Sequence, residues 1–207
     1  MKFDNITPNN YLNEILLIIR EGILLETPKM KISEKETKKN QALAEVFNII
    51  GTSKPKNKIG ASQEHIGKAS HREDIYFYLC NDNRTRLFYI EAKRLPKPKS
   101  TDQEDYIIGK STSGNPCGGI ERFKLGIHGH PLDKSNNGLI GYIENKSINE
   151  WETFINQKIL SEYPDDTKLI KKSSPINEYH SSHTYTCDVE GIFNLHHFLI
   201  DLTKNIK

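Results

Sequence analysis

The sequence has little cysteine: three residues in 207, none of them in a Cys-x-x-Cys spacing. Disulfide-rich secreted scaffolds and the common zinc motifs need more cysteine at closer spacings. A few dispersed thiols are typical of a reducing compartment, and we therefore expect a cytoplasmic protein. The three residues are Cys80, Cys117 and Cys187.

Long apolar runs are also missing. No stretch approaches the roughly 18 apolar residues of a membrane helix, and the first residues, MKFDN, lack the apolar core of a signal peptide. We therefore expect no membrane partner. Neither sign of charge dominates, because 29 Lys and Arg face 27 Asp and Glu for a net charge of +2. Net charge thus argues neither for nor against a nucleic-acid partner.

Two familiar ligand motifs are absent. The segment SGNPCGG (113–119) lacks the Gly-x₄-Gly-Lys-Ser/Thr spacing, and no buried strand leads into it, which excludes a nucleotide P-loop. The HGH segment (128–130) has no third ligand at a metal-binding spacing. His183 and Cys187 are four apart, as a zinc site could use, but dispersed core and surface histidines explain these residues better than zinc.

The first fifty residues predict two helices. Apolar residues recur every three or four positions over 9–26, and Thr27-Pro28 ends that helix. Ser33 has the character of an N-cap, with Glu36 three residues on as its capping-box partner. The helix that they begin ends at Gly51.

The middle of the chain predicts a β-hairpin. Segments 74–80 (DIYFYLC) and 86–95 (RLFYIEAKRL) are rich in β-branched and aromatic residues, and the turn-forming residues NDNRT lie between them. A short strand is expected within 59–66. These three strands would form one antiparallel group.

The remaining pattern predicts α/β order. We expect a helix at 119–127, a buried strand at 139–145, an amphipathic helix at 147–161, and strands in TKLIKK (167–172) and SHTYTC (182–187). The pattern of GIFNLHHFLIDL (191–202) leaves helix and strand open. The predicted fold is a mixed central sheet flanked by helices, in a single domain over 1–207.

The hairpin brings an acid back against an acid and a lysine. Side chains alternate along a strand, so Glu91 and Lys93 share one face. A two-residue turn pairs Asp74 with Glu91, whereas a four-residue turn pairs Asp74 with Lys93. Either register places all three side chains on one face, within reach of one another.

Adjacent carboxylates repel unless a positive charge lies between them. Lys93 alone could supply that charge in a structural ion pair. Mg²⁺ would serve better, because it prefers oxygen ligands, activates water and neutralises phosphodiester charge. The lysine could then orient the water or stabilise charge on the phosphate.

Asp74, sixteen intervening residues, and Glu91-Ala92-Lys93 resemble the motif of the PD-(D/E)xK nuclease superfamily, which has the restriction-endonuclease-like fold. The resemblance covers roughly 33–145, which would be the nuclease-like core. Residues 1–32 would be an N-terminal helical extension, and 146–207 a C-terminal helix and strand extension without a counterpart in the family core. Glu73 stands where the motif has proline.

The resemblance implies roles for particular residues. Asp74 and Glu91 would be metal ligands, and Lys93 would act on water and phosphate. Families of this type often add a glutamate from the first core helix, for which Glu45 is the candidate and Glu64 the rival. Arg122 would face the site from the crossover helix.

Basic residues follow the motif directly. Arg94, Lys97 and Lys99 lie in a proline-rich, extended segment just past the predicted site. They would contact the phosphate backbone, or else form a solubilising loop.

The sequence therefore predicts a Mg²⁺-dependent endonuclease, with Mn²⁺ able to substitute, that hydrolyses DNA in restriction or antiphage defence. A homodimer or a partner protein would supply recognition or activation. Two alternatives stay open: a catalytically silent nuclease-like module that binds nucleic acid or holds an assembly together, and an RNA endonuclease.

Overall fold

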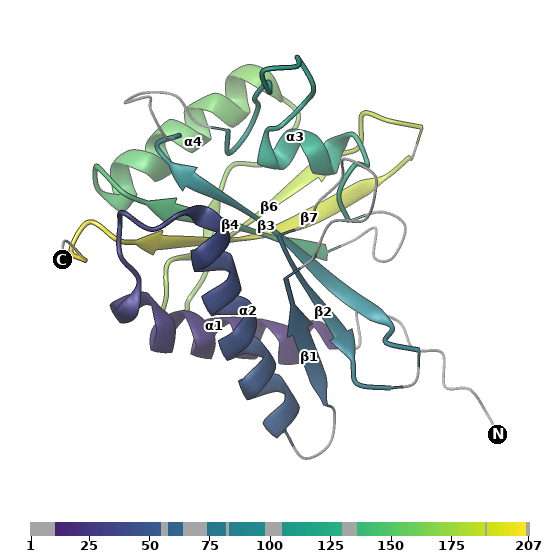
Figure 1. Ribbon diagram of the computed structural model, residues 1–207. Helices are drawn as coiled ribbons and strands as arrows, with labels where there is room; N and C mark the ends of the chain where they lie inside the picture. Colours follow the sequence, from purple (N-terminus) through teal and green to yellow (C-terminus); the bar gives the residue numbers. More distant parts are fainter. Residues whose placement is uncertain are drawn as a thin grey trace.

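A computed structural model describes residues 11–54, 58–63, 74–81, 83–97, 105–129, 136–188 and 190–205. Within these residues, seven strands form one mixed sheet in the order β1-β2-β3-β4-β7-β6-β5 (Figure 1). The pairs β3–β4 and β4–β7 are parallel, and the other four are antiparallel. The three central strands of the sheet are therefore parallel, and an antiparallel group lies on each side of them.

The first half of the chain supplies two helices and the antiparallel meander. The elements are α1 (Leu12–Glu26), the 3-10 turn η2 (Thr27–Lys29), α2 (Glu36–Ser53), β1 (Ile59–Ser62), β2 (Ile75–Leu79) and β3 (Arg86–Leu95). β1, β2 and β3 pair in succession, as the turn residues between β2 and β3 predict.

The second half supplies the crossovers and the far side of the sheet. The elements are α3 (Gly119–Lys124), β4 (Asn136–Ile143), α4 (Ile148–Glu162), β5 (Ile170–Lys171), β6 (Glu178–Thr184) and β7 (Ile192–Asp201). α3 lies in the connection between the parallel strands β3 and β4. The last segment, whose pattern left helix and strand open, is the strand β7, and it pairs with β4 along its length.

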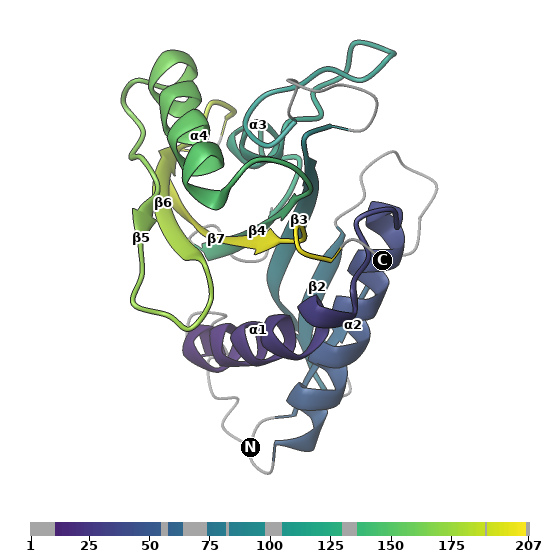
Figure 2. The ribbon, with the colours of Figure 1, turned by 90° about the vertical axis from the view of Figure 1, so that its left-hand side faces the viewer.

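Helices cover both faces of the sheet. Figure 2 shows α3 and α4 on one side and α1 and α2 on the other. Phe47 of α2 stacks on Phe77 of β2 in the core of the α1–α2 side, whereas Trp151 of α4 is buried on the opposite side. Along β3, Ile90 and Ala92 enter the first core and Leu95 the second.

The predicted α/β class, with a mixed sheet flanked by helices, is confirmed. The hairpin is confirmed as well, and the predicted element order matches, with ends that differ by a few residues. Among the residues that the structure describes, no helix combines the length and the apolar character that a membrane span requires.

The predicted capping box at the start of α2 is wrong. The helix begins at Glu36, and its N-cap is Lys35, which has no side-chain capping bond. Glu36 does not reach back to Ser33; its Oε2 accepts a hydrogen bond from the Arg94 amide of β3 at 3.1 Å. A contact with a distant strand has therefore replaced the local cap.

The far side of the sheet contains a chain of buried polar side chains. Ser181 Oγ hydrogen-bonds both His183 Nε2 and His197 Nε2 at 2.6 Å. The chain continues from His183 Nδ1 to Asp166 Oδ2 at 2.7 Å, and from His197 Nδ1 to the Tyr106 hydroxyl at 3.0 Å. Burial lowers the pKa of both histidines. Ser181, Asp166 and Tyr106 thus satisfy the two neutral imidazoles inside the core.

His196 faces the α1–α2 side and is also buried. Its ring lies 5.4 Å from that of His180. Burial, reinforced by His180, lowers the pKa of His196 from 6.5 to about 4. His196 is therefore neutral in the folded protein at a pH where the unfolded chain already binds a proton.

Because its folded pKa is depressed, His196 should make the protein less stable as pH falls from about 6.5 toward 4. We expect the free energy of unfolding of the wild type to drop by about 2–3 kcal/mol more than that of His196→Gln over this range. Urea unfolding of both proteins at pH 7.0 and 4.5 measures the difference. A wild-type-minus-variant difference that is the same at both values of pH would contradict the assignment.

Candidate functional site

The register of the hairpin sets Asp74 opposite Glu91. Ile75 pairs with Ile90 in antiparallel strands, so Asp74, just before β2, lies opposite Glu91 of β3. This is the first of the two predicted registers, but the connection is longer than two residues. The register shifts between Phe77 and Tyr78, and the Leu79 amide donates to the Thr85 carbonyl at 2.9 Å. A bulge thus absorbs the difference and leaves the Asp74 end in register.

Glu91 is a buried carboxylate surrounded by cationic side chains. It is 1% exposed. Lys93 Nζ and Arg122 Nη1 both donate to its Oε1, at 2.6 and 3.1 Å. Its Oε2 lies 3.3 Å from His128 Nδ1. Burial alone would raise the pKa of Glu91, but Lys93, His128 and Arg122 outweigh burial and hold that pKa below its ordinary value. Glu91 is therefore ionised at neutral pH.

The surroundings of Asp74 raise its pKa, whereas those of Glu91 lower the pKa of Glu91. Asp74 Oδ2 accepts a hydrogen bond from the Ala92 amide at 2.7 Å. Burial, followed by the negative charges of Glu91 and Glu36, raises its pKa well above the ordinary value, and Lys93 offsets this only in part. The positive charge near Asp74 is therefore too small to offset burial and the two neighbouring carboxylates.

Glu36 is the third carboxylate of the group, and sequence reasoning missed it. It enters from the first turn of α2 and is bonded to the Arg94 amide. Burial raises its pKa; Lys93 lowers that pKa and Glu91 raises it again, so Glu36 belongs to the same charge cluster. In the sequence, Glu36 stood out only as an acid at the start of the first core helix. The predicted capping box with Ser33 already accounted for an acid there.

The structure does not bring Glu45 to this group. Glu45 lies nine residues after Glu36 on α2, about 13 Å along the axis and on the opposite side of the helix. It is exposed and accepts a hydrogen bond from Gln41 at 2.9 Å. Its rival, Glu64, lies outside the described residues.

The predicted phosphate-binding residues are mostly engaged in ion pairs. Arg94 forms a two-pronged pair with Glu144, with both distances 2.7 Å. Lys97 pairs with Asp105 at 2.8 Å, and its side chain is 35% exposed. Arg122 contacts Glu91, as described above. Lys99 lies outside the described residues.

A pocket of about 480 Å³ opens beside the carboxylates. Glu36 and Lys93 belong to both the charge cluster and the pocket wall. The full lining is Lys35, Glu36, Thr37, Lys93, Arg94, Lys97 and Asp105. Four of these seven residues are basic and two are acidic, which leaves a modest excess of positive charge, although Lys93, Arg94 and Lys97 are each paired with a carboxylate.

The donor set fits a hard divalent cation, although its side chains are not arranged as ligands. Among the described residues, no three His, Cys, Asp or Glu side chains are placed to hold a metal ion. Glu91 Oε2 is nonetheless buried without a hydrogen bond, and the charge of Lys93 offsets only part of what raises the pKa of Asp74. A cation with oxygen ligands would satisfy both. Asp74 and Glu91 are thus the residues that would hold it, with Glu36 beside them.

This arrangement predicts that Asp74 lowers the stability of the metal-free protein. The variant Asp74→Asn would keep an acceptor for the Ala92 amide while removing a charge that burial, Glu91 and Glu36 disfavour. We expect Asp74→Asn to raise the free energy of unfolding by about 1–2 kcal/mol at pH 8 in EDTA. The gain should shrink as pH falls, because a raised pKa means that folded Asp74 takes up its proton first.

Chemical unfolding at pH 8 and pH 5 tests this expectation. Asp165→Asn is the matched control, because Asp165 is exposed and lies outside the cluster. A destabilised Asp74→Asn protein at pH 8, or a gain equal to that of Asp165→Asn, would argue against electrostatic repulsion at Asp74.

Comparisons of the chain with protein-family models, with curated proteins and with solved structures found no match.

Proposed function

We propose that this protein is a metal-dependent endonuclease of the PD-(D/E)xK type, which hydrolyses DNA phosphodiester bonds. The observation that carries the proposal is the meeting of Asp74, Glu91 and Lys93 at the end of the hairpin, where the charge of Glu36 also acts on Asp74 and Lys93. Lys93 cannot balance both carboxylates. It donates to Glu91, and it offsets only part of what raises the pKa of Asp74.

The arrangement of elements supports the same proposal. A helix, a three-stranded antiparallel meander, a crossover helix and a parallel strand occur here as α2, β1–β3, α3 and β4. This is the order expected of a restriction-endonuclease-like core. A role in restriction or antiphage defence, with a homodimer or partner protein supplying recognition, belongs to the same proposal and rests on family resemblance.

Each side chain has a role that follows from its surroundings. Mg²⁺ held by Asp74 and Glu91 would supply an activated water and neutralise phosphate charge. Burial would lower the pKa of Lys93, but Glu91, Asp74 and Glu36 outweigh it and raise that pKa. Lys93 therefore stays cationic at neutral pH and acts as a charge that orients water and phosphate, not as a base. The basic pocket would take a neighbouring phosphate.

A second candidate function is nucleic-acid binding without cleavage. It is favoured by the way the polar groups already satisfy one another: Glu91 Oε1 has two donors, and Asp74 Oδ2 has the Ala92 amide. A group of this kind can persist without a metal. The two candidates share the same surface and differ in whether a divalent cation enters it.

The cleavage assay separates the candidates. Plasmid, linear duplex, single-stranded DNA and RNA are each incubated with wild type in Mg²⁺, Mn²⁺ or EDTA. We expect cleavage of DNA with either metal and none in EDTA. Lys93→Met should lower the rate about 10²- to 10³-fold, because it removes the positive charge beside the reacting phosphate.

Lys158→Met is the control for Lys93→Met, since Lys158 forms a surface pair with Glu162 on α4. It should cleave like wild type. Binding without metal-dependent cleavage of any polymer would replace the nuclease proposal with the binding module, and cleavage of RNA alone would make the protein an RNA endonuclease.

The two glutamates of α2 give a sharper test of the site. We expect Glu36→Gln to reduce metal-dependent cleavage about 10- to 100-fold, because Glu36 interacts with Asp74 and Lys93 next to the metal ligands. Glu45→Gln, the same change on the opposite side of the helix, should stay close to wild type. The measurement is the initial rate over a range of Mg²⁺ concentrations. The reverse pattern would restore Glu45 as the helix carboxylate.

A further inference from the structure

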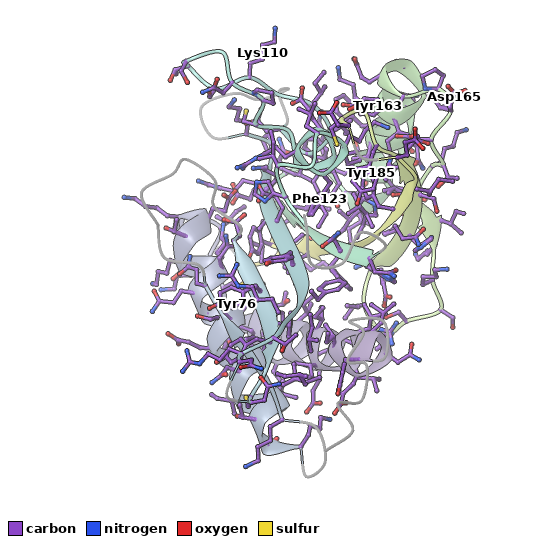
Figure 3. All side chains as sticks on the ribbon, turned by 90° about the vertical axis from the view of Figure 1, so that its right-hand side faces the viewer. Tyr76, Lys110, Phe123, Tyr163, Asp165 and Tyr185 are labelled. Atoms are coloured by element: carbon purple, nitrogen blue, oxygen red, sulfur yellow. The ribbon has the colours of Figure 1, made fainter. Side chains whose placement is uncertain are left out.

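The face of β2 that carries Asp74 also carries two tyrosines. Ile75 and Phe77 point into the α1–α2 core, so alternation puts Asp74, Tyr76 and Tyr78 on the opposite face. Both tyrosine side chains are half-buried, and their ring centroids are 5.7 Å apart. Tyr76 is marked in Figure 3. The aromatic pair is therefore in line with the carboxylate along one strand.

An arginine lies over each ring. The Arg86 guanidinium carbon is 4.8 Å from the Tyr76 ring centroid, and that of Arg84 is 5.7 Å from the Tyr78 centroid. Both distances are within the range of a cation–π contact. We call Tyr76, Tyr78, Arg84 and Arg86 the tyrosine–arginine platform.

The backbone of β1 fixes one ring of the platform. Gly60 pairs directly with Tyr78, and a Cβ on Gly60 would lie 2.4 Å from Tyr78 Cζ. The Tyr78 ring therefore rests on the strand where a side chain would otherwise be. A ring that lies against a strand backbone keeps its orientation without a rearrangement on binding.

Aromatic rings beside cations are the chemistry that binds single-stranded nucleic acid. Unpaired bases stack on aromatic side chains whatever their sequence, and arginine adds cation–π and phosphate contacts. Bases within a duplex are already stacked and paired, so they offer no free ring face. A platform that stacks on bases would therefore favour unpaired over paired substrates.

We propose that the tyrosine–arginine platform binds unpaired bases of a single-stranded nucleic acid and leads the strand to Asp74. The inference deepens the proposed function, on which it rests for the chemistry at Asp74, by naming the substrate class. Residues two apart on a strand are about 7 Å apart, so Tyr76 and Tyr78 lie about 7 and 13 Å along β2 from Asp74. The pocket that contains Lys93 and Lys97 also contains Glu36, whose negative charge acts on Asp74. A bound strand would contact the platform, the acids and the basic pocket.

Binding without cleavage tests the platform. Fluorescence anisotropy in EDTA follows a labelled 15-nucleotide dT strand, and separately a 15-base-pair duplex, at one fixed salt concentration. We expect wild type to bind the single strand more tightly than the duplex. Tyr76→Leu and Tyr78→Leu should each weaken single-strand binding about tenfold and leave duplex binding unchanged, because leucine keeps the apolar bulk but has no ring face. Tyr76→Phe, which keeps the ring, should bind like wild type.

Tyr163→Leu is the matched control. Tyr163 is also half-buried with a cation over its ring, Lys124 Nζ at 4.3 Å, and Figure 3 shows it well away from Tyr76. It should bind both ligands like wild type. Equal loss for the single strand and the duplex, unchanged single-strand affinity in both leucine variants, or no single-strand binding by wild type would each overturn the platform. Circular dichroism confirms that every variant is folded.

The outcomes for the platform and for the nuclease are separable. If wild type cleaves DNA with Mg²⁺ but the leucine variants bind single strands normally, the platform fails and the nuclease stands. If single-strand binding depends on the tyrosines while no polymer is cleaved, the platform stands and the nuclease fails.

Discussion

Glu91 holds a carboxylate that is almost fully removed from water, and it stays charged because cations surround it. A buried charge without such partners would cost several kcal/mol. Lys93 comes from the same strand, but Arg122 comes from α3, so the connection that carries the chain from β3 to its parallel neighbour β4 must also deliver a guanidinium to Oε1. The crossover is therefore needed both to bring β4 beside β3 and to neutralise the charge of Glu91.

Strand composition and the turn residues were enough to predict the hairpin. Period-two alternation then placed Asp74, Glu91 and Lys93 on one face in either of the two registers that the sequence left open. The bulge between Phe77 and Tyr78 explains why the turn length was a poor guide to register. Glu36 could not be found in this way. Its role depends on where α2 docks against β3, and its position in the sequence had an adequate local explanation as a cap.

β7 shows the same limit in a core element. Its segment carries two adjacent histidines among apolar residues, and a short apolar run buried on both faces cannot be told from a helix by periodicity. In the sheet, His197 is satisfied by Ser181 and Tyr106 on one face, while His196 lies near Phe88 on the other. The two histidines made the hydrophobic pattern of this segment ambiguous. The partners of His197 come from β6 and from the segment before α3, so the segment itself does not reveal them.

The charged side chains of the site would be arranged differently with and without a divalent cation. Without a divalent cation, Lys93 and Arg122 both donate to Glu91, and burial with the charges of Glu91 and Glu36 raises the pKa of Asp74. Under the proposed function Asp74 and Glu91 would hold a cation, which would offset the repulsion between their charges and weaken the hold of Lys93 on Glu91. Under the proposed function Lys93 would then be less tightly bound to Glu91, and it already forms part of the wall of the adjacent pocket. The polar bonds that favour a silent module are thus the ones that a metal would have to replace under the proposed function.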